Sequence, residues 1–312
     1  MMPSQRCSRR KIESLRFCQS REGGSEVNKM QERREENGKT DERGQWFVSA
    51  LPLLGQGLTE ILQTAREWEW PGVELVMDGE VWQHPGGAIQ HIRKSLLGED
   101  LPITLHAPVF EINLANPLYP EQRLLAERQY VGALVTAAEL GAGHVVIHPG
   151  YGSRTYDRDL AQSFAREHLA RLCKMAERLG VLMVVENAGV GPAALFDQNE
   201  FAALIEEFYS PYCGAIVDIG HAFANGWDLP GLFAALGDRV RAVHIHDNGG
   251  SADEHLPLGH GHLPWAEVER AIRALPSPVH QVIEYREDTD LEVIRSHVAR
   301  LTGRERAKAG GI

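Results

Sequence analysis

Four side chains able to bind a metal ion or move a proton stand at the ends of short apolar runs in the second half of the chain. They are Glu186 at the end of VLMVVE, Asp218 at the end of GAIVD, His244 at the end of VRAVH and Glu284 at the end of HQVIE. Each run has the length of a buried strand, and a helical pattern separates it from the next. Burying a carboxylate or an imidazole costs several kcal/mol unless the group is paired or binds a metal. Four such groups in register predict one polar site at one end of a parallel sheet.

Carboxylates mixed with imidazoles suit Mn²⁺, Zn²⁺, Co²⁺ or Fe²⁺ more than Ca²⁺. We expect the four side chains to bind one divalent ion and to leave room beside it for substrate oxygens. The alternative for any one of them is a core polar group satisfied by hydrogen bonds. For four consecutive strand ends this alternative is weak, because carboxylates buried together without a cation repel one another.

Five further residues extend this set at the ends of other apolar runs or in the loops that follow them: His106, His148, His221, Asp253 and His255. The last three have the types for another metal site, and the first two can share Glu186 with a third ion. The residues leave open the alternative that these histidines bind substrate hydroxyls or a phosphate. The expected cofactor is therefore a divalent metal, Zn²⁺, Mn²⁺, Co²⁺ or Mg²⁺, in one to three ions.

Seven other histidines divide into two groups. Three in loops are weaker candidates, because a loop histidine is more often solvated: His246, His260 and His262. Four are expected to be structural or surface residues: His144, His168, His280 and His297.

The elements that must position these residues form a regular alternation. Eight apolar runs read as strands, over residues 47–53, 72–78, 101–108, 144–150, 181–189, 213–221, 240–248 and 278–285. A helical pattern follows each one and is least clear after the second. Such alternation implies a parallel sheet with right-handed crossovers. Eight units over some 260 residues predict an α/β protein with a closed (β/α)₈ TIM barrel. The competitor, a doubly wound open sheet, usually has a glycine-rich phosphate loop after strand one, and SALPLLGQG is not one.

The alternation of side chains along the strands places the candidates together at one end of the barrel. In such barrels the chemistry lies where the strands end, and side chains point alternately into the barrel and toward the helices. An interior position lies two residues before each candidate, as Val184 does before Glu186, so that six strand-end side chains can point inward together. Glu74 and Asp78 on strand two also share a parity, and either is expected to hold an arginine or backbone amides.

Outside the barrel the composition changes. Residues 1–45 contain 11 Lys and Arg, 8 Asp and Glu and few large apolar residues, whereas the whole 312-residue chain has a formal charge of −11. Such a segment cannot bury enough apolar area to offset chain entropy, so we expect a disordered tail over 1–45, a barrel over 46–303 and a flexible end over 304–312. Mixed charge without interleaved aromatic residues argues against a nucleic-acid-binding arm.

Cysteine usage and hydropathy indicate a location. The four cysteines, Cys7, Cys18, Cys173 and Cys213, form no CxxC pair and no disulfide-like framework. No apolar run approaches the length of a membrane span, and the N-terminal residues lack a secretory apolar region. We therefore expect a reduced, cytoplasmic protein without a membrane partner.

The series LHAP, IHPG, VVENAG, VDIGHAF, HIHDN, DEHLPLGHG and VIEY resembles the xylose isomerase-like barrel superfamily. It is most similar to the sugar phosphate isomerase/epimerase members and to their relative endonuclease IV, over residues 46 to 303. Each motif alone is short, but the ordered set is specific. One departure is Leu258-Gly259-His260-Gly261, where the isomerase-like members usually have Leu-Gly-Glu-Gly.

The resemblance implies roles for the candidates. Glu186, Asp218, His244 and Glu284 match the shared metal site of the superfamily, whose ketose epimerases use the two glutamates to move a proton. The remaining ligands of the trinuclear zinc site of the endonuclease branch fall on the other five: His106, His148, His221, Asp253 and His255.

Two enzymes and a binding protein follow as hypotheses. The first is a metal-dependent sugar or sugar-phosphate isomerase/epimerase, in which a Lewis-acid metal stabilises an enediolate while Glu186 and Glu284 move the proton and His221 orients a substrate oxygen. The second is an endonuclease IV-like zinc phosphodiesterase acting on abasic DNA, which the acidic charge of the barrel disfavours. The third, a barrel that binds a ligand without catalysis, is disfavoured because every ligand type is present.

The expected partners are a small carbohydrate and, since such barrels often pair, a second copy of the chain. One rim patch after strand four is the place where a polyanion would bind, and a solvated loop is its alternative: Tyr151, Arg154, Tyr156 and Arg158.

Overall fold

The structure is a computed structural model that describes residues 44–97 and 100–303. The tail expected over 1–45 lies outside the described residues except for its last two, and the flexible end expected over 304–312 lies wholly outside them.

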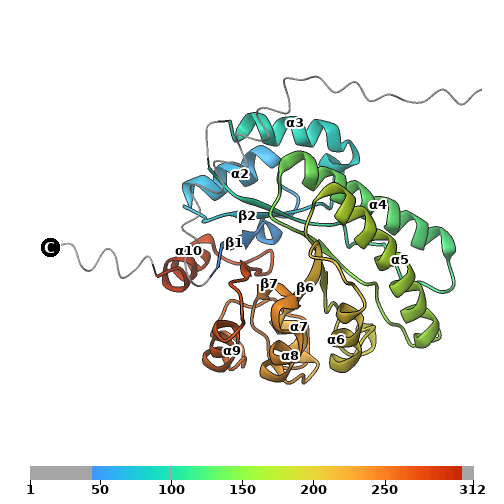
Figure 1. Ribbon diagram of the computed structural model, residues 1–312. Helices are drawn as coiled ribbons and strands as arrows, with labels where there is room; N and C mark the ends of the chain where they lie inside the picture. Colours follow the sequence, from blue (N-terminus) through green and yellow to red (C-terminus); the bar gives the residue numbers. More distant parts are fainter. Residues whose placement is uncertain (1–43, 98–99, 304–312) are drawn as a thin grey trace, which may run out of the picture. The chain divides into compact units, whose positions relative to one another are not determined.

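Eight parallel strands close into a barrel in chain order (Figure 1). They are β1 (Trp46–Ser49), β2 (Val73–Val76), β3 (Ile103–His106), β4 (Val145–Ile147), β5 (Met183–Glu186), β6 (Cys213–Asp218), β7 (Val240–Ile245) and β8 (His280–Ile283). The predicted (β/α)₈ barrel is confirmed, with all eight strands inside the ranges read from the sequence except that β1 begins one residue earlier.

Helices surround the barrel, with at least one between each pair of strands and one after the last. They are α2 (Leu58–Glu67), α3 (Pro85–Ser95), α4 (Pro120–Leu140), α5 (Arg158–Leu179), α6 (Gln198–Glu206), α7 (Ile219–Ala224), α8 (Leu229–Leu236), α9 (Trp265–Arg273) and α10 (Leu291–Leu301). In the described residues no helix combines the length and apolarity that crossing a membrane requires.

Local chemistry explains where several of the helices begin or end. The Asp157 carboxylate accepts a hydrogen bond from Leu160 N and caps α5. The Asp197 carboxylate caps α6 in the same way. Both α4 and α5 end at a glycine in the left-handed conformation, Gly141 with φ 64° and Gly180 with φ 66°, which a residue with a side chain adopts at a cost.

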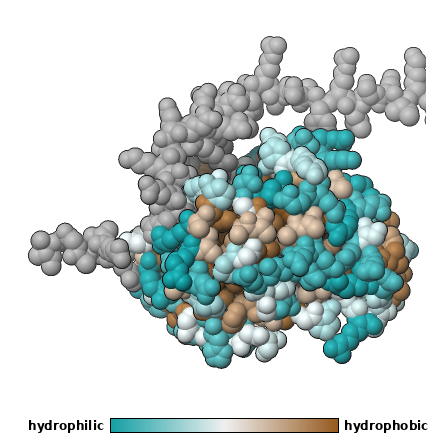
Figure 2. Space-filling model, turned by 60° about the horizontal axis from the view of Figure 1, so that its bottom comes forward, coloured by the Kyte–Doolittle hydropathy of each residue, from teal (hydrophilic) through white to brown (hydrophobic). Residues whose placement is uncertain are grey.

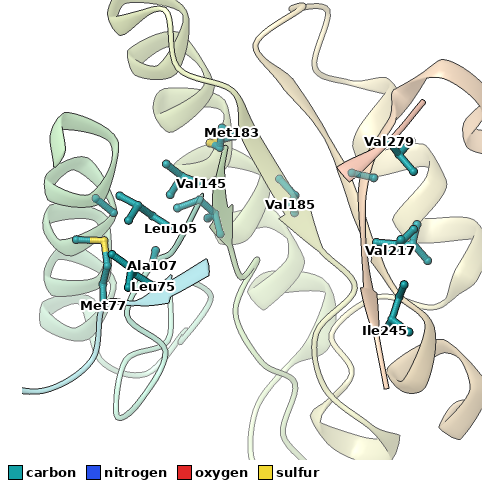
Figure 3. Packing of buried hydrophobic residues seen from close by; sticks show 14 of the residues in the cluster. Leu75, Met77, Leu105, Ala107, Val145, Met183, Val185, Val217, Ile245 and Val279 are labelled. Carbon is teal, nitrogen blue, oxygen red and sulfur yellow. The ribbon is translucent and has the colours of Figure 1, made fainter. Parts of the chain in front are cut away.

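Two apolar layers hold the strands. Outward-facing side chains such as Leu75, Leu105 and Val217 pack against the helices in the larger core (Figure 3). Inward-facing side chains form a separate cluster inside the barrel, made of Val146, Val184, Ile216 and Ala242. Each member of the inner cluster lies two residues before a candidate residue, so the predicted parity is confirmed and the candidates stand one layer above this apolar floor.

Strand six ends earlier than expected. The sequence predicts a strand over 213–221, but β6 ends at Asp218 and α7 begins at Ile219. The reason is that the Asp218 carboxylate accepts a hydrogen bond from His221 N at 2.7 Å and caps the short helix. A candidate metal ligand therefore also starts a helix, and this turn brings the imidazole of His221 back toward it.

The expectation for the cysteines is wrong for two of them. Cys173 of α5 and Cys213 at the start of β6 form a disulfide, with their Cα atoms 6.0 Å apart. Forty residues separate them, and no local motif marks such a pair; only the packing of α5 against the sheet brings them together. Cys7 and Cys18 lie outside the described residues.

Candidate metal centre

The four principal candidates converge on one imidazole nitrogen. His244 Nδ1 lies 3.1 Å from Glu284 Oε2, 3.5 Å from Glu186 Oε2 and 3.8 Å from Asp218 Oδ2. All four side chains are buried. The strand register brings them together, because Asp218 and His244 are direct neighbours on β6 and β7. Three carboxylates and one imidazole thus meet at the carboxyl ends of β5 to β8, where the sequence predicts a metal site.

The other nitrogen of His244 is held by a carboxylate deeper in the barrel. Glu74, fully buried on β2, accepts hydrogen bonds from His244 Nε2 at 3.0 Å, His144 Nε2 at 3.1 Å and Thr104 Oγ1 at 3.2 Å. Burial alone raises the pKa of Glu74, but the facing imidazoles of His244 and His144 lower it well below the ordinary value. Glu74 therefore stays ionised and fixes the proton of His244 on Nε2, which leaves Nδ1 to face the site.

This role of Glu74 was not predicted. The only signal in the sequence is its shared parity with Asp78 on strand two, and the three donors to Glu74 come from strands distant in sequence. For Asp78 the expectation of bound backbone amides is confirmed, since its carboxylate accepts from Val109 N and Phe110 N at 3.1 to 3.3 Å.

His106 and His148 flank Glu186 on the side of β3 and β4. Glu186 Oε2 lies 3.0 Å from His148 Nε2 and 3.5 Å from His106 Nε2. The other nitrogen of each ring is engaged, His106 Nδ1 by the Ala107 carbonyl at 2.9 Å and His148 Nδ1 by the Tyr151 hydroxyl at 2.7 Å. Burial lowers the pKa of His106, but Glu186 outweighs it and brings the pKa to about 9. Both rings thus present Nε2 to the same carboxylate.

His221, Asp253 and His255 form the third part of the cluster. His221 Nε2 lies 3.0 Å from Asp253 Oδ2, and His255 Nε2 lies 3.0 Å from Asp253 Oδ1. The group joins the centre through His221 Nδ1, which lies 3.2 Å from Glu186 Oε1. All nine residues predicted as candidates are therefore brought together.

The expectation for His246, a weaker candidate in a solvated loop, is wrong. It is fully buried, and its Nε2 lies 2.9 and 3.0 Å from the two Asp218 carboxylate oxygens. Its ring stacks on that of His255 with centroids 3.9 Å apart. Gly220 makes room for it, because a Cβ there would lie 2.0 Å from the His246 ring. The available signal was parity, since His246 follows His244 by two.

The remaining histidines divide much as expected. His260 and His262 are exposed. His168 is buried against Glu127 at 2.7 Å. His144 is structural but fully buried, and its Nδ1 lies 2.8 Å from His280 Nδ1, so that it links the site to the opposite end of the barrel.

The rim patch after β4 is largely occupied by internal contacts. Arg158 forms an ion pair with Glu200, and Tyr156 hydrogen-bonds the Tyr151 carbonyl. Arg154 is exposed and, with Arg158, lines a hollow of about 420 Å³ beside Trp227.

Two observations test whether the residues fit a divalent ion. The buried Nδ1 atoms of His221 and His244 have no hydrogen-bond partner among the described residues, although carboxylate oxygens lie 3.1 to 3.2 Å away. The candidates, in two cases together with His246, also form groups of three or four whose ligand atoms lie within 4.8 Å of one another. Lone pairs of imidazoles beside carboxylates are the donors that zinc and manganese ions bind, so the residues fit such an ion.

The electrostatics of the cluster favour positive charge at its centre. Burial lowers the pKa of His244, but Glu284, Glu74 and Glu186 raise it well above the ordinary value. The pKa of His221 is raised in the same sense, against burial, by Asp218. Burial raises the pKa of Glu186, yet His148 and His244 bring it well below the ordinary value. The carboxylates together stabilise a cation among them, whether a proton or a metal.

Comparison with known proteins agrees with this architecture. A family model described as "Xylose isomerase-like TIM barrel" matches residues 62–305. The chain belongs to the xylose isomerase-like TIM barrel family.

Two relatives of this chain carry the names of different activities. A fructoselysine 3-epimerase of Escherichia coli O157:H7 is 26% identical over 217 residues, which covers 64% of this chain and 77% of that protein. A probable endonuclease 4 of Streptomyces avermitilis is 27% identical over 236 residues, which covers 68% of this chain and 75% of that protein. Among solved structures, the IOLI protein with a bound zinc atom superposes with a TM-score of 0.71 at 16% identity, covering 86% of this chain and all of that chain. Both of these relatives are named as enzymes, which supports an enzyme here as well.

Proposed function

We propose that the protein is a divalent-metal-dependent isomerase or epimerase of sugars or sugar phosphates. One observation carries the proposal. Two glutamates from different strands, Glu186 of β5 and Glu284 after β8, approach the same nitrogen of His244 at 3.5 and 3.1 Å. Such a pair brackets a small substrate, as the chemistry of moving a proton between two carbon positions requires.

The residues that would hold the ion are Glu186, Asp218, His244 and Glu284. A divalent ion there would supply Lewis acidity toward a carbonyl oxygen and its neighbouring hydroxyl. One glutamate removes the proton from the carbon between or beside these oxygens, and the other returns it. His221, anchored by Asp253, orients a substrate oxygen, and burial excludes water from the proton transfer.

The test combines metal content with proton exchange. The purified protein, analysed for metals and incubated in D₂O with ketoses and ketose phosphates, is expected to contain a divalent ion and to exchange one carbon-bound proton, followed by NMR. Glu284→Gln should lower the exchange rate by roughly 10² to 10⁴, the usual contribution of a positioned acid or base. If the metal-loaded protein exchanged a carbon-bound proton of none of the sugars tested, the result would count against the proposal.

A second candidate function has its own observation. Five residues beyond the central four gather in the same cluster: His106, His148, His221, Asp253 and His255. A set of nine ligands is more than one ion needs and would suit several ions that clamp a phosphodiester. The formal charge of −11 counts against a DNA substrate.

Nicking of an abasic-site duplex separates the two candidates. Three zinc ions per chain with efficient nicking would replace the isomerase proposal, whereas about one ion and no nicking would exclude the nuclease. His255→Ala should abolish activity only where a further ion at Asp253 is needed, while Glu284→Gln should be fatal in both cases.

A further inference from the structure

Exposed apolar side chains concentrate on one part of the outer helical layer. Of eleven large hydrophobic residues exposed in the described part of the chain, six lie between positions 110 and 135. They are Phe110, Leu118, Tyr119, Leu124, Leu125 and Val135. Figure 2 shows brown, hydrophobic residues lying among hydrophilic ones on one face of the molecule. A local concentration on one helix and the loop before it marks a surface that meets another molecule.

Helix α4 is apolar on two faces. One face packs against the barrel through residues such as Tyr130 and Leu134, which are buried. The opposite face carries Leu124, which is 56% exposed, and Val135, which is 43% exposed. Val131, at its border, is half-buried and packs partly against the core. A hollow of about 460 Å³ on that face is lined by Glu121, Leu124, Glu127, Arg128 and Val131. A helix that needed only to cover the barrel would be polar here.

Two opposite charges frame the exposed leucines. Glu121 and Arg128 lie seven residues apart on α4 and line the same hollow as Leu124, and among the described residues neither side chain forms an ion pair or a hydrogen bond. Their midpoint falls between Leu124 and Leu125. At a rise of 1.5 Å per residue, the two charges stand about 10 Å apart along the helix axis.

That arrangement is complementary to itself. If a second α4 lies antiparallel across the first, with a two-fold axis between Leu124 and Leu125, Glu121 of each chain faces Arg128 of the other. The leucines of both chains then meet at the axis, enclosed by two ion pairs. A two-fold interface requires a patch to match its own copy, and the symmetric placement of the two charges about the leucines meets this requirement.

We infer that the protein forms a homodimer through the α4 face. Burial of the apolar side chains at the interface supplies the affinity, and the paired charges fix the antiparallel register of the two α4 helices. The inference does not depend on the proposed activity, since none of its residues belongs to the metal centre.

Charge reversal tests both the surface and the register. The full chain, measured by size-exclusion chromatography with light scattering at tens of micromolar, should have twice the chain mass of 34.6 kDa. Arg128→Glu places four acidic groups at the interface and Glu121→Arg places four basic ones, so each variant alone should be monomeric. When the two are mixed, the acidic face of one meets the basic face of the other, and a heterodimer should form.

A matched control and a fold check complete the experiment. Lys174→Glu reverses an exposed charge on the neighbouring helix α5 and should leave the dimer unchanged. Circular dichroism should show equal melting temperatures for the two α4 variants as monomers, because neither residue has a partner to lose among the described residues. A monomeric wild type, a dimer that survives both reversals, or a mixture that stays monomeric would each overturn the inference.

Discussion

A carboxylate buried inside the barrel decides which nitrogen of His244 faces the candidate metal centre. Glu74 accepts the Nε2 proton of His244 at 3.0 Å and, from the other side, that of His144 at 3.1 Å. A glutamine at this position would accept a hydrogen bond from one of the two imidazoles through its amide oxygen, but its amide nitrogen would have to donate one to the other. An ionised group at this position therefore keeps both tautomers fixed, and the orientation of a candidate ligand depends on a fully buried residue.

We predict that Glu74→Gln weakens metal binding by about 10- to 100-fold, the usual effect of losing a carboxylate that orients a ligating histidine. Competition with a coloured chelator measures this affinity without reference to activity. Thr104→Val is the matched control, because it removes the third donor to Glu74 but keeps the contact with His244. Equal affinities in wild type and Glu74→Gln would show that His244 needs no such support.

His297 gives a pH dependence that is separate from the metal centre. Its Nδ1 accepts a hydrogen bond from the Tyr285 hydroxyl at 2.8 Å, and burial, with Arg300 and His260, lowers its pKa to about 4. The pKa of His297 is lower in the folded chain than in the unfolded chain, so folding favours its neutral form. Its contribution to the free energy of unfolding is therefore complete above about pH 6.5 and is lost as pH falls toward 4.

For His297 we predict that wild type loses about 1 kcal/mol more than His297→Gln between pH 7 and pH 4.5, after allowance for partial exposure of the ring. Urea unfolding at a series of pH values measures the difference. A constant difference across that range would mean that the imidazole titrates alike in the folded and unfolded chains.

The sequence was informative for the site because side chains alternate in direction along a strand, so the candidate ligands at the strand ends can be assigned to the inside of the barrel. Glu186, Asp218 and Glu284 each close an apolar run, and the register of neighbouring strands then forces them together. Glu74 and His246 escaped prediction for opposite reasons. Glu74 lies mid-strand, where its partners come from distant strands. His246 was expected in a solvated loop because it follows the apolar run, whereas the path of the chain after β7 buries it beneath Gly220.

At the scale of elements, the alternation of runs fixes the order of strands but not the points where polar side chains end them. β6 stops at Asp218 because the same carboxylate that faces the metal centre caps α7. The disulfide between α5 and β6 is likewise a product of packing, since its cysteines are 40 residues apart. Contacts that cross between elements carry no local pattern, so the sequence alone did not show them.

We predict that the disulfide stabilises the folded barrel by about 2–4 kcal/mol, because closing a loop of 40 residues lowers the entropy of the unfolded chain. Urea unfolding with and without a reductant measures the loss. Cys173→Ala in the oxidised state should unfold like the reduced wild type, and the reductant should not shift this variant. A wild-type protein whose intact mass is unchanged by reduction would show that the two sulfurs are not joined.

Across the whole molecule, the candidate metal centre joins elements that are far apart in sequence. Its ligand candidates come from β3 to β8 and from the loop after β7, so an ion bound there would connect most of the barrel wall. The cluster also concentrates four buried carboxylates, Glu186, Asp218, Glu284 and Glu74, around one imidazole. Their mutual repulsion opposes folding unless protons or a cation offset it.

We therefore predict that a divalent ion stabilises the fold by mass action. At a free concentration 100 times the dissociation constant, the gain is about 2.7 kcal/mol, or roughly 5–10 °C in Tm for a domain of this size. Thermal unfolding with zinc or manganese, against a chelator, measures it. The gain should shrink below about pH 6, because protons compete for the same nitrogens and oxygens. Asp218→Asn should lose most of the gain, whereas His260→Ala, at an exposed position outside the cluster, should keep it. If both variants kept the full increment, the ion would be binding elsewhere, and the convergence of carboxylates on His244 would have to be held by protons alone.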